Sequence, residues 1–213
     1  MVGISIGKLK IIKSLYYESK LNARQIAVKM DVSIDSVYSF MKRHNLPRRN
    51  LIEENKLRFE RKIKSFKVKT RLNAKEEKLK AIGIALYWGE GYKSEKSKGV
   101  DFTNSDVSMI VAFLCFLRKI CGIDEKRLRV LLYCYANQNP RKLIEFWVST
   151  TGISKKQFTK PYVRKDFNHD KIGKMKHGLI HIRYSDKKLL FLIKKWIFEY
   201  QQICVGGRAV NYS

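Results

Sequence analysis

The feature that most constrains the fold of this chain is a helix-forming stretch that ends in GIALYWGEG, Gly83 to Gly91. The stretch is strongly apolar, yet it ends in a carboxylate, Glu90, between two glycines. Ala85 and Gly89 are four residues apart, so they lie on one helix face and form a small-residue seam. Such a seam lets a second helix backbone approach closely, and Gly91 supplies the C-terminal break. We therefore expect Glu90 at the end of a tightly packed pair of helices.

The position of Glu90 needs an explanation, because the helix dipole places partial negative charge at the C-terminal end. A carboxylate there is unfavourable by about 0.3 kcal/mol or more. A bound cation would offset that cost, whereas the simpler alternative is an ordinary solvated glutamate. The residues around Glu90 leave both interpretations open.

The charge balance indicates a polyanionic partner. The 213 residues contain 45 Lys and Arg against 19 Asp and Glu, a net charge of +26. Such an excess costs self-repulsion in a compact state, and nucleic acid is the leading partner that would offset it. A ribosomal or membrane-surface role is the alternative. However, 45% of the residues are hydrophobic, so the chain can bury a core and is not a basic tail.

The sequence also bears on the compartment. No apolar run reaches the roughly 18 residues of a membrane span, and the N-terminus lacks the separate charged, apolar and cleavage regions of a signal peptide. The cysteines have no C-x-x-C spacing and apolar neighbours, so we expect reduced core thiols in a cytoplasmic protein. They are Cys115, Cys121, Cys134 and Cys204.

Residues 1–50 divide into three short helical patterns. The first covers Leu9–Ser19. The second begins after Asn22, which forms a capping box with Gln25 three residues later. The third begins after Ser33 and ends before Pro47, which stops it. This spacing predicts a small all-helical module.

The run RQIAVKMDVSIDSVYSFMKRH resembles the helix-turn-helix of resolvases and many small regulators. Ala27 stands where close helix approach needs a small residue, and Asp31 occupies the turn position that is usually Gly. The resemblance implies that Ile34–His44 lies in the major groove. The residues that it implies to face DNA are Ser33, Ser36, Ser39, Lys42 and Arg43, with the Arg48-Arg49 extension adding charge. The alternative is a three-helix packing module without DNA contact.

A charged connector follows this module. Leu51–Lys80 is rich in Lys, Arg and Glu and contains no Pro or Gly, so we expect it to be helical and partly exposed. Asn73, with Glu76 three residues later, is expected to cap the next helix. The expected organisation is a helix-turn-helix module over residues 1–50, a charged helical connector over 51–72, a larger domain over 73–202 and a tail over 203–213.

GIALYWGEG itself resembles the LAGLIDADG motif of homing endonucleases. In register, Gly91 is the closing glycine and Glu90 takes the place of the catalytic acid, while Ala85 and Gly89 take the interface positions. Two positions depart from the motif. Gly83 replaces the opening leucine, and Trp88 stands where the first, non-catalytic acid would be.

The elements that follow support this resemblance. A hairpin is expected over residues 92–104, helices over 106–121, 140–152 and 187–201, and strands over 126–137, 158–167 and 177–185. The order is helix, two strands, helix, two strands and helix, with one inserted helix, and it is similar to the LAGLIDADG fold. The expected class is therefore α+β, with a LAGLIDADG-type mixed domain preceded by a small all-α helix-turn-helix module.

The alternation along each expected strand places one set of side chains on the face away from the helices. Basic and aromatic residues gather in this set, which suits a DNA groove because Arg pairs bidentately with guanine. The set is Arg127, Arg129, Tyr133, Tyr135, Lys160, Tyr162, Arg164, His181 and Arg183. The alternative is a basic sheet side that faces solvent. His177 also shares a face with His181, but two histidines without further ligands make a weak metal site.

The motif occurs once, and a single-motif member of this family works as a homodimer. The resemblance then implies that two copies pack along Ala85 and Gly89 and bring two Glu90 carboxylates together. Two carboxylates at such a short distance repel each other, which either raises the pKa of one of them or recruits divalent cations. Their hard oxygen ligands suit Mg²⁺. The Gly89 carbonyl is a further ligand candidate. Arg183 and Lys93 are candidates by position for the basic residue that would complete the site.

Three functions stay open at this point. The first is a homodimeric, Mg²⁺-dependent, site-specific endonuclease that acts on double-stranded DNA. The second is a non-cleaving transcription regulator built on a degenerate LAGLIDADG domain, which the helix-turn-helix, Trp88 and the use of Glu for the more usual Asp favour. The third is an intron maturase-like RNA binder, against which the helix-turn-helix argues. Cleavage needs Glu90 and metal, whereas regulation needs neither.

Overall fold

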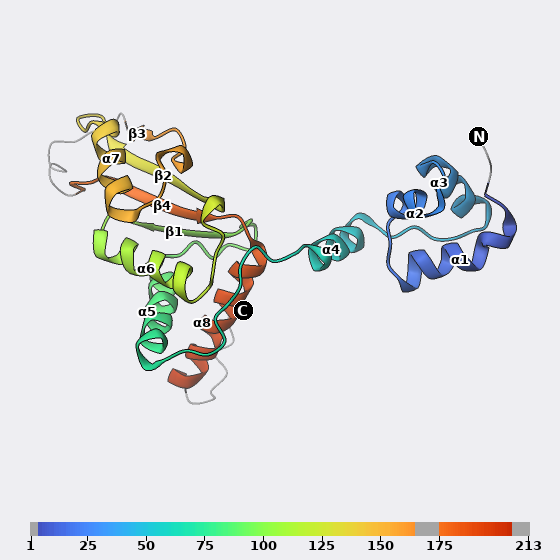
Figure 1. The fold of residues 1–213 in the computed structure, drawn as a ribbon, viewed down its shortest axis with the longest axis horizontal. Coiled ribbons are helices and arrows are strands. Elements are labelled where there is room, and N and C mark those ends of the chain that lie inside the picture. The colour runs from blue at the N-terminus through green and yellow to red at the C-terminus, as the bar shows by residue number, and fades with distance from the viewer. Residues whose placement is uncertain (1–3, 165–174, 206–213) are drawn as a thin grey trace. The chain divides into compact units, whose positions relative to one another are not determined.

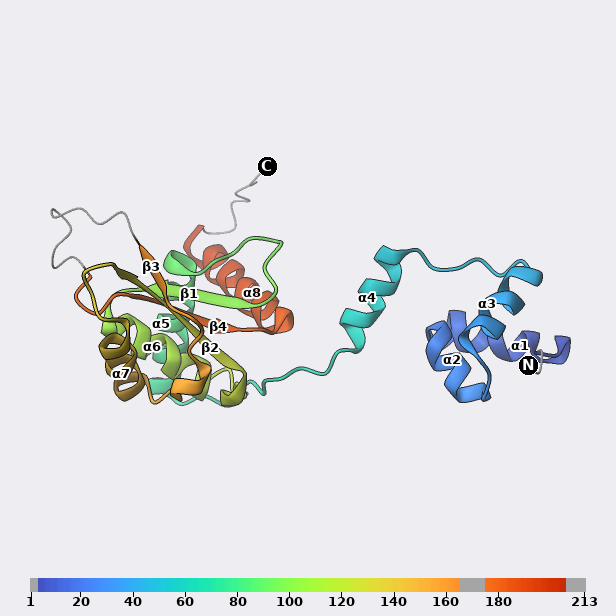
Figure 2. The same ribbon diagram turned by 90° about the horizontal axis from the view of Figure 1, so that it is seen from above.

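The computed structural model describes residues 4–164 and 175–205, and the chain divides into two compact units, residues 1–63 and residues 64–213 (Figures 1 and 2). Each unit has its own hydrophobic core, and the two cores share no residue. They are therefore separate structural units.

The described part of the first unit is helical, as the sequence predicts. Asn22 and Gln25 form the expected capping box at the start of the second helix, and Ser33 accepts a hydrogen bond from the Ser36 N–H at the start of the third. Asp31 adopts the left-handed turn conformation, at φ 53° and ψ 50°. The elements are a 3-10 turn (Ile6–Lys8), α1 (Leu9–Lys13), a π-helical turn (Ser14–Glu18), α2 (Ala23–Met30), α3 (Ile34–Arg43) and α4 (Leu51–Arg61).

The core of the first unit forms between α1, α2 and α3. Ile12, Ile26, Val37 and Met41 are fully buried in it. Their spacing along α3 leaves the opposite side of that helix exposed, because residues three or four apart share one face. The helical segments expected in residues 1–50 therefore pack around one core.

The charged connector expected to be helical over residues 51–72 is helical only in its first half. α4 begins after Asn50, which forms a capping box with Glu53, and it ends at Arg61. Residues 62–73 are not helical. α4 belongs to the first unit, and the boundary between the units falls after Ile63 rather than at residue 50.

The segment after α4 is attached to the second unit. The backbone N–H and the hydroxyl of Ser65 both donate to Asp186, at 3.0 and 2.7 Å. Phe66 forms an antiparallel bridge with Ile123, and its ring joins the core of the second unit. These contacts explain why the segment is extended, since a helix would remove the backbone groups that it uses.

The second unit is a mixed α+β domain, which confirms the expected class. Its four-stranded sheet has the order β1-β4-β2-β3. β4 runs antiparallel to both β1 and β2, whereas β3 runs parallel to β2. The elements are α5 (Ala74–Glu90), β1 (Val100–Asn104), α6 (Val107–Lys119), a 3-10 turn (Glu125–Arg127), β2 (Leu128–Tyr135), α7 (Pro140–Thr151), a 3-10 turn (Lys155–Gln157), β3 (Tyr162–Arg164), β4 (Leu179–Tyr184) and α8 (Lys187–Val205).

Helices α5, α6 and α8 lie on one side of the sheet (Figure 1). The side chains that alternate toward them are apolar and buried, among them Phe102 of β1, Val130 of β2 and Ile182 of β4. α7 adds Trp147 to the same core, and its indole N–H donates to the His177 carbonyl at 2.7 Å. The hydrophobic core therefore fills the space under one sheet face only.

Several strand and helix boundaries differ from the expected ones. The hairpin over residues 92–104 is reduced to β1 with a bridge from Gly91 to Phe102. The strand expected over 158–167 is β3 alone, preceded by a bridge from Phe158 to Val130, and residues 165–167 lie outside the described residues. Pro161 lacks an N–H for the ladder, which accounts for the late start of β3. α8 continues to Val205, so the expected tail begins inside a helix.

One glycine of α5, Gly83, has a packing role that the sequence did not predict. A Cβ at Gly83 would lie 2.1 Å from Cγ of Phe116 on α6, so Gly83 is the residue that permits close helix packing within the chain. Ala85 and Gly89, the expected seam between two copies, are exposed and do not pack within the chain. Gly91 ends the helix in an extended conformation, and it must be glycine because a Cβ would lie 2.5 Å from the Tyr87 ring. The Asn73 capping box is confirmed.

Three of the cysteines are free thiols, Cys115, Cys121 and Cys134, and the last two are buried, as expected. The side chain of Cys204 lies outside the described part of the structure. Among the described residues, no helix is both long enough and apolar enough to cross a membrane.

Candidate nucleic-acid interface

The residues predicted to face DNA from α3 divide into two groups. Ser39, Lys42 and Arg43 are exposed, as a major-groove helix requires. Ser33 and Ser36 are engaged with each other, because the Ser33 hydroxyl accepts the Ser36 N–H at 3.0 Å and lies 2.8 Å from the Ser36 hydroxyl. Their first role is therefore to begin the helix, and the residues best placed to reach a ligand are those beyond the first turn.

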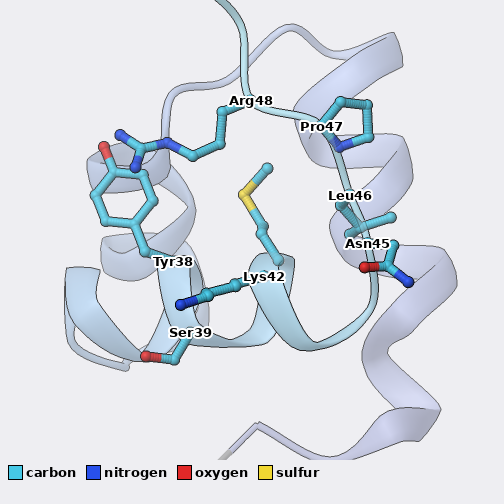
Figure 3. Close-up of a pocket in the computed structure, with 8 residues that line it drawn as sticks. Tyr38, Ser39, Lys42, Asn45, Leu46, Pro47 and Arg48 are labelled. Carbon is cyan, nitrogen blue, oxygen red and sulfur yellow. The ribbon is translucent and has the colours of Figure 1, made fainter.

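A hollow of about 580 Å³ lies beside this part of α3 (Figure 3). Tyr38, Ser39 and Lys42 line it from α3, and Pro47 and Arg48 line it from the segment that follows. The Arg48 guanidinium carbon lies 4.0 Å from the centre of the Tyr38 ring, a cation–π contact that holds the side chain over the helix.

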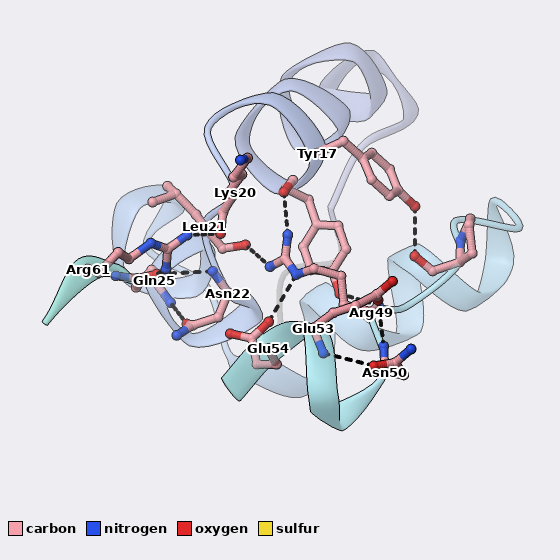
Figure 4. A network of polar contacts seen from close by, with 12 residues as sticks. Tyr17, Lys20, Leu21, Asn22, Gln25, Arg49, Asn50, Glu53, Glu54 and Arg61 are labelled. Carbon is pink, nitrogen blue, oxygen red and sulfur yellow. Dashed lines mark hydrogen bonds and ion pairs between the residues drawn. The ribbon is translucent and has the colours of Figure 1, made fainter. Parts of the chain in front are cut away.

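The neighbouring arginine has the opposite orientation. Arg49 donates to the carbonyls of Tyr16 and Leu21, both at 2.6 Å, and to the Glu54 carboxylate at 3.0 Å (Figure 4). Its guanidinium also lies 3.9 Å from the centre of the Tyr16 ring. Because its side chain is only 11% exposed, Arg49 fixes α4 to the helical core and does not contribute to a nucleic-acid surface.

In the second unit, the strand register brings polar residues together on the sheet face away from the helices. Asp101 of β1 is opposite Arg183 of β4, which is opposite Arg129 of β2. One step along, Thr103 is opposite His181. We call this the polar sheet face. It comprises Asp101, Thr103, Arg129, Tyr133, Tyr162, Arg164, His181 and Arg183, each half-buried or exposed.

Three aromatic rings cross the polar sheet face as a row. The Tyr133 ring lies 4.8 Å from that of Tyr162 on β3 and 5.0 Å from that of His181 on β4. The outer ring, Tyr162, is 55% exposed. The row therefore gives the face a stiff aromatic strip beside its arginines, a combination that suits contact with sugar and base edges.

Asp101 organises the other end of this face. One carboxylate oxygen accepts from His181 Nδ1 at 2.9 Å, and the other accepts from Arg183 Nε at 2.9 Å. Thr103 Oγ1 lies 2.8 Å from the same Nδ1. Since a carboxylate only accepts, the neutral ring carries its proton on Nδ1. Burial alone would raise the pKa of Asp101, but the bonds and charges of His181 and Arg183 outweigh it and lower that pKa.

Glu90 lies at the edge of this network. A hollow of about 440 Å³ is lined by Glu90 with Gly89, Gly91 and Tyr92 from the end of α5, and by Asp101, Thr103, His181 and Arg183 from the sheet. The structure thus brings the predicted acid together with two of the predicted basic residues, which are distant in sequence. Of the two candidates for the completing basic residue, Arg183 lines this hollow.

Lys93, the other candidate, has a different position. Its ammonium donates to the carbonyls of Trp88 and Gly91, at 2.8 and 2.7 Å. Burial lowers the pKa of Lys93, and the charge of Glu90 opposes that shift. Lys93 therefore supplies, within the chain, a cation at the negative end of α5, so the helix dipole alone no longer requires a bound metal ion beside Glu90.

Several predicted contact residues are displaced from the polar sheet face, buried on it or engaged with nearby backbone. Arg127 precedes β2 and donates to the Ser185 carbonyl at 2.7 Å. Tyr135 points to this face but is only 7% exposed. Lys160 is exposed in the loop before β3, and Arg129 turns back to the carbonyls of Lys126 and Leu128. The orientation of these side chains depends on where each strand begins and on which segments lie beside it. The alternation of residues along a strand specifies neither.

The pair of histidines does not form a site. His177 lies in the turn before β4, and its ring stacks on Phe146 at 3.8 Å. His181 is bonded to Asp101 instead. Among the described residues, no group of three or more His, Cys, Asp or Glu side chains is arranged to hold a metal ion.

Asp101 and Thr103 also belong to the site, and the pattern of basic residues in the sequence does not point to them. The signal that could have found them is the alternation of VDFTN, where the buried Val100 and Phe102 place Asp101 and Thr103 on the other face. Their partners on β4 were not predictable in the same way, because the pairing joins residues 80 positions apart.

Comparison of the chain with protein-family models gives no match, and neither does comparison with curated proteins or with solved structures.

Proposed function

We propose that this protein binds double-stranded DNA and hydrolyses its phosphodiester bonds at specific sites, as a homodimer that uses Mg²⁺. The observation that carries the proposal is the hollow beside Glu90, in which an exposed carboxylate adjoins Arg183 and His181 on a basic and aromatic face. The second unit has the expected helices around a four-stranded sheet, although the first hairpin is reduced to β1, and we propose that it is a LAGLIDADG-type domain in which α5 would supply the acid.

The local charge favours cleavage over binding alone. On a chain of net charge +26, a surface selected only to hold DNA gains nothing from acids beside the phosphates, because each one repels them. Asp101 is accounted for, since it positions His181 and Arg183. Among the described residues, the Glu90 side chain has no such partner apart from the nearby charge of Lys93. A role in chemistry would explain why an acid stands at this position.

The oxygen ligands at the end of α5 are of the type that binds Mg²⁺. Glu90 offers a carboxylate and Gly89 a backbone carbonyl, and Mg²⁺ is usually held by one or two carboxylates together with substrate phosphates. When bound there, the ion would supply a water molecule of lowered pKa for attack on phosphorus. Arg183 would bind the phosphate group, Asp101 would keep Arg183 and His181 in place, and Lys93 would hold the end of α5 that carries Glu90.

The exposed side of α5 supports the homodimer. Ala85 and Gly89 face outward, and no atom lies within 4 Å of a Cβ built at Gly89. Ile82 and Trp88 are 49% and 40% exposed on the same helix. A second copy packed along this seam would cover apolar surface and bring a second Glu90 near the first.

Replacing Glu90 by Gln tests the cleavage part of the proposal. We expect Glu90→Gln to lower the cleavage rate by about 100-fold or more, while duplex affinity stays the same or rises because a charge that repels phosphate is lost. Glu95→Gln, at an exposed acid five residues further on, is the matched control and should keep full activity. Unchanged cleavage with weaker binding in Glu90→Gln would refute the assignment.

The second candidate function is a non-cleaving transcription regulator. Two observations favour it: Trp88 occupies the position of the motif's first acid, and Asp101 is committed to His181 and Arg183, which leaves one uncommitted acid in the hollow. A regulator would bind its sites with equal affinity in Mg²⁺ and in EDTA and leave both strands intact. The endonuclease would bind in EDTA and cut in Mg²⁺.

A further inference from the structure

We propose that the hollow beside α3 is a binding site for one sugar–phosphate unit of the DNA backbone, with Arg48 as its phosphate ligand. The inference rests on the proposed DNA binding, and it assigns a role to a residue outside the helix expected to read bases. The hollow is lined by Tyr38, Ser39, Met41, Lys42, Asn45, Leu46, Pro47 and Arg48 (Figure 3).

Arg48 is held in place while its hydrogen-bond donors stay available. Its guanidinium carbon lies 4.0 Å from the centre of the Tyr38 ring, and Figure 3 shows the group against that ring. Among the described residues, no hydrogen bond or ion pair uses this guanidinium. Stacking on an aromatic face lowers the entropy lost when arginine binds, and its planar fork matches two phosphate oxygens.

The lining of the hollow has the chemistry of a nucleotide backbone. Lys42 supplies a second cation, and Ser39 and Asn45 supply a hydroxyl and an amide. Pro47 gives the hollow an exposed apolar surface suited to the carbon face of deoxyribose, whereas Met41 and Leu46 are almost fully buried and keep the shape of the hollow fixed. None of the eight lining residues is acidic, so nothing in the hollow opposes a phosphate.

The position of Arg48 favours a backbone contact over a base contact. α3 ends at Arg43, and Arg48 follows Pro47 in the segment beyond the helix. The side chains that a major-groove helix offers to base edges come from the helix itself, whereas flanking segments contact phosphates and fix the register. Arg48 should therefore strengthen binding to every duplex without changing which sequence is preferred.

The adjacent Arg49 provides a natural comparison. Its donors are used within the first unit, on Tyr16, Leu21 and Glu54 (Figure 4). Loss of Arg49 should lower the melting temperature, whereas loss of Arg48 should leave it unchanged. This difference separates a ligand-binding arginine from a structural one in consecutive positions of the chain.

The test measures affinity of the full-length protein for two duplexes, its selected site and a random sequence, between about 50 and 200 mM salt. Arg48→Ala should lose about 3- to 10-fold affinity for both duplexes equally, and the slope of log K against log salt should fall by about 0.9. Arg48→Lys should keep the slope while losing part of the affinity. Tyr38→Leu should also keep the slope but bind more weakly. The charge of Arg48 stays, but the Tyr38 ring no longer holds its guanidinium in place.

Four results would overturn the site. Unchanged affinity and slope in Arg48→Ala would show that the stacked arginine has no ligand, and a loss confined to the selected site would show that Arg48 reads a base. Wild-type protein that binds neither duplex would overturn both this site and the proposed function. Lys13→Ala, which removes an exposed charge outside the hollow, measures the general effect of charge, and a loss as large as that of Arg48→Ala would likewise refute the assignment.

Discussion

Gly83 is a position of the second unit where a single added methyl group should have a large effect on stability. A Cβ there would lie 2.1 Å from Cγ of Phe116 and 2.5 Å from Cβ and Cδ2 of the same residue. Carbon atoms in good contact are about 3.5–4.0 Å apart. Phe116 is fully buried, and its ring is packed against Phe113 and Trp196, so it has little room to move. α5 and α6 would have to separate.

Two opposing effects set the magnitude. Alanine in a helix interior is favoured over glycine by about 1 kcal/mol. Overpacking in a fixed core costs about 1–3 kcal/mol, and more where the backbone must shift. A contact of 2.1 Å belongs at the upper end of this range of overpacking costs. After the helix preference for alanine is subtracted, we expect Gly83→Ala to lower the free energy of unfolding by about 2 kcal/mol. Gly89→Ala, with no atom within 4 Å, should instead raise it by about 0.5–1 kcal/mol.

Urea unfolding followed by tryptophan fluorescence reports this difference for the second unit alone. All three tryptophans of the chain, Trp88, Trp147 and Trp196, lie in that unit. The measurements belong at low protein concentration, so that dimer formation does not add to stability. A Gly83→Ala midpoint equal to or above that of the wild type would refute the close packing of α5 on α6. A Gly89→Ala monomer with a lower free energy of unfolding than the wild type would refute the exposure of the Ala85 and Gly89 seam.

Three further predictions concern the neighbourhood of Glu90. Asp101→Asn should lower the free energy of unfolding by about 1–3 kcal/mol at pH 7. Because the native pKa of Asp101 is lowered from 3.8, its contribution is present above that pH and is lost as the pH falls through the native pKa. The difference from wild type should therefore shrink in acid, and an equal difference at pH 7 and pH 3 would contradict the network. Lys93→Met should cost about 1 kcal/mol in urea unfolding by removing the cation at the end of α5, whereas Lys96→Met at an exposed position should cost nothing measurable. Gly89→Phe should shift the monomer–dimer equilibrium toward monomer in sedimentation, and an unmoved equilibrium would place any dimer contact elsewhere.

The local parts of the fold were predictable from the sequence because they depend on neighbours within a few residues. The caps at Asn22, Ser33 and Asn73 all form as expected. Alternation along β2 and β4 correctly placed Tyr133 and Arg183 on the polar sheet face. In each case one or two residues determine the local hydrogen bond or the side of the strand.

The parts that the sequence did not reveal depend on distant partners. Gly83 and Gly89 are both small residues in one helix, and only the position of Phe116 decides which of them faces a neighbour within the chain. Arg48 and Arg49 are identical in type and adjacent, yet one lies on the surface and the other is bonded inside. The site beside Glu90 also needed tertiary structure, because it joins the end of α5 to β1 and β4.

The most direct test of the account is a selection from a pool of random duplexes with the purified protein, in Mg²⁺ and in EDTA, with both bound and cut molecules sequenced. The account predicts enrichment of sites with two-fold symmetry in both buffers, and ends at a fixed offset within those sites only in Mg²⁺. Enriched sites that stay intact in both buffers would contradict cleavage and identify a regulator. No enrichment in either buffer would contradict specific DNA binding itself.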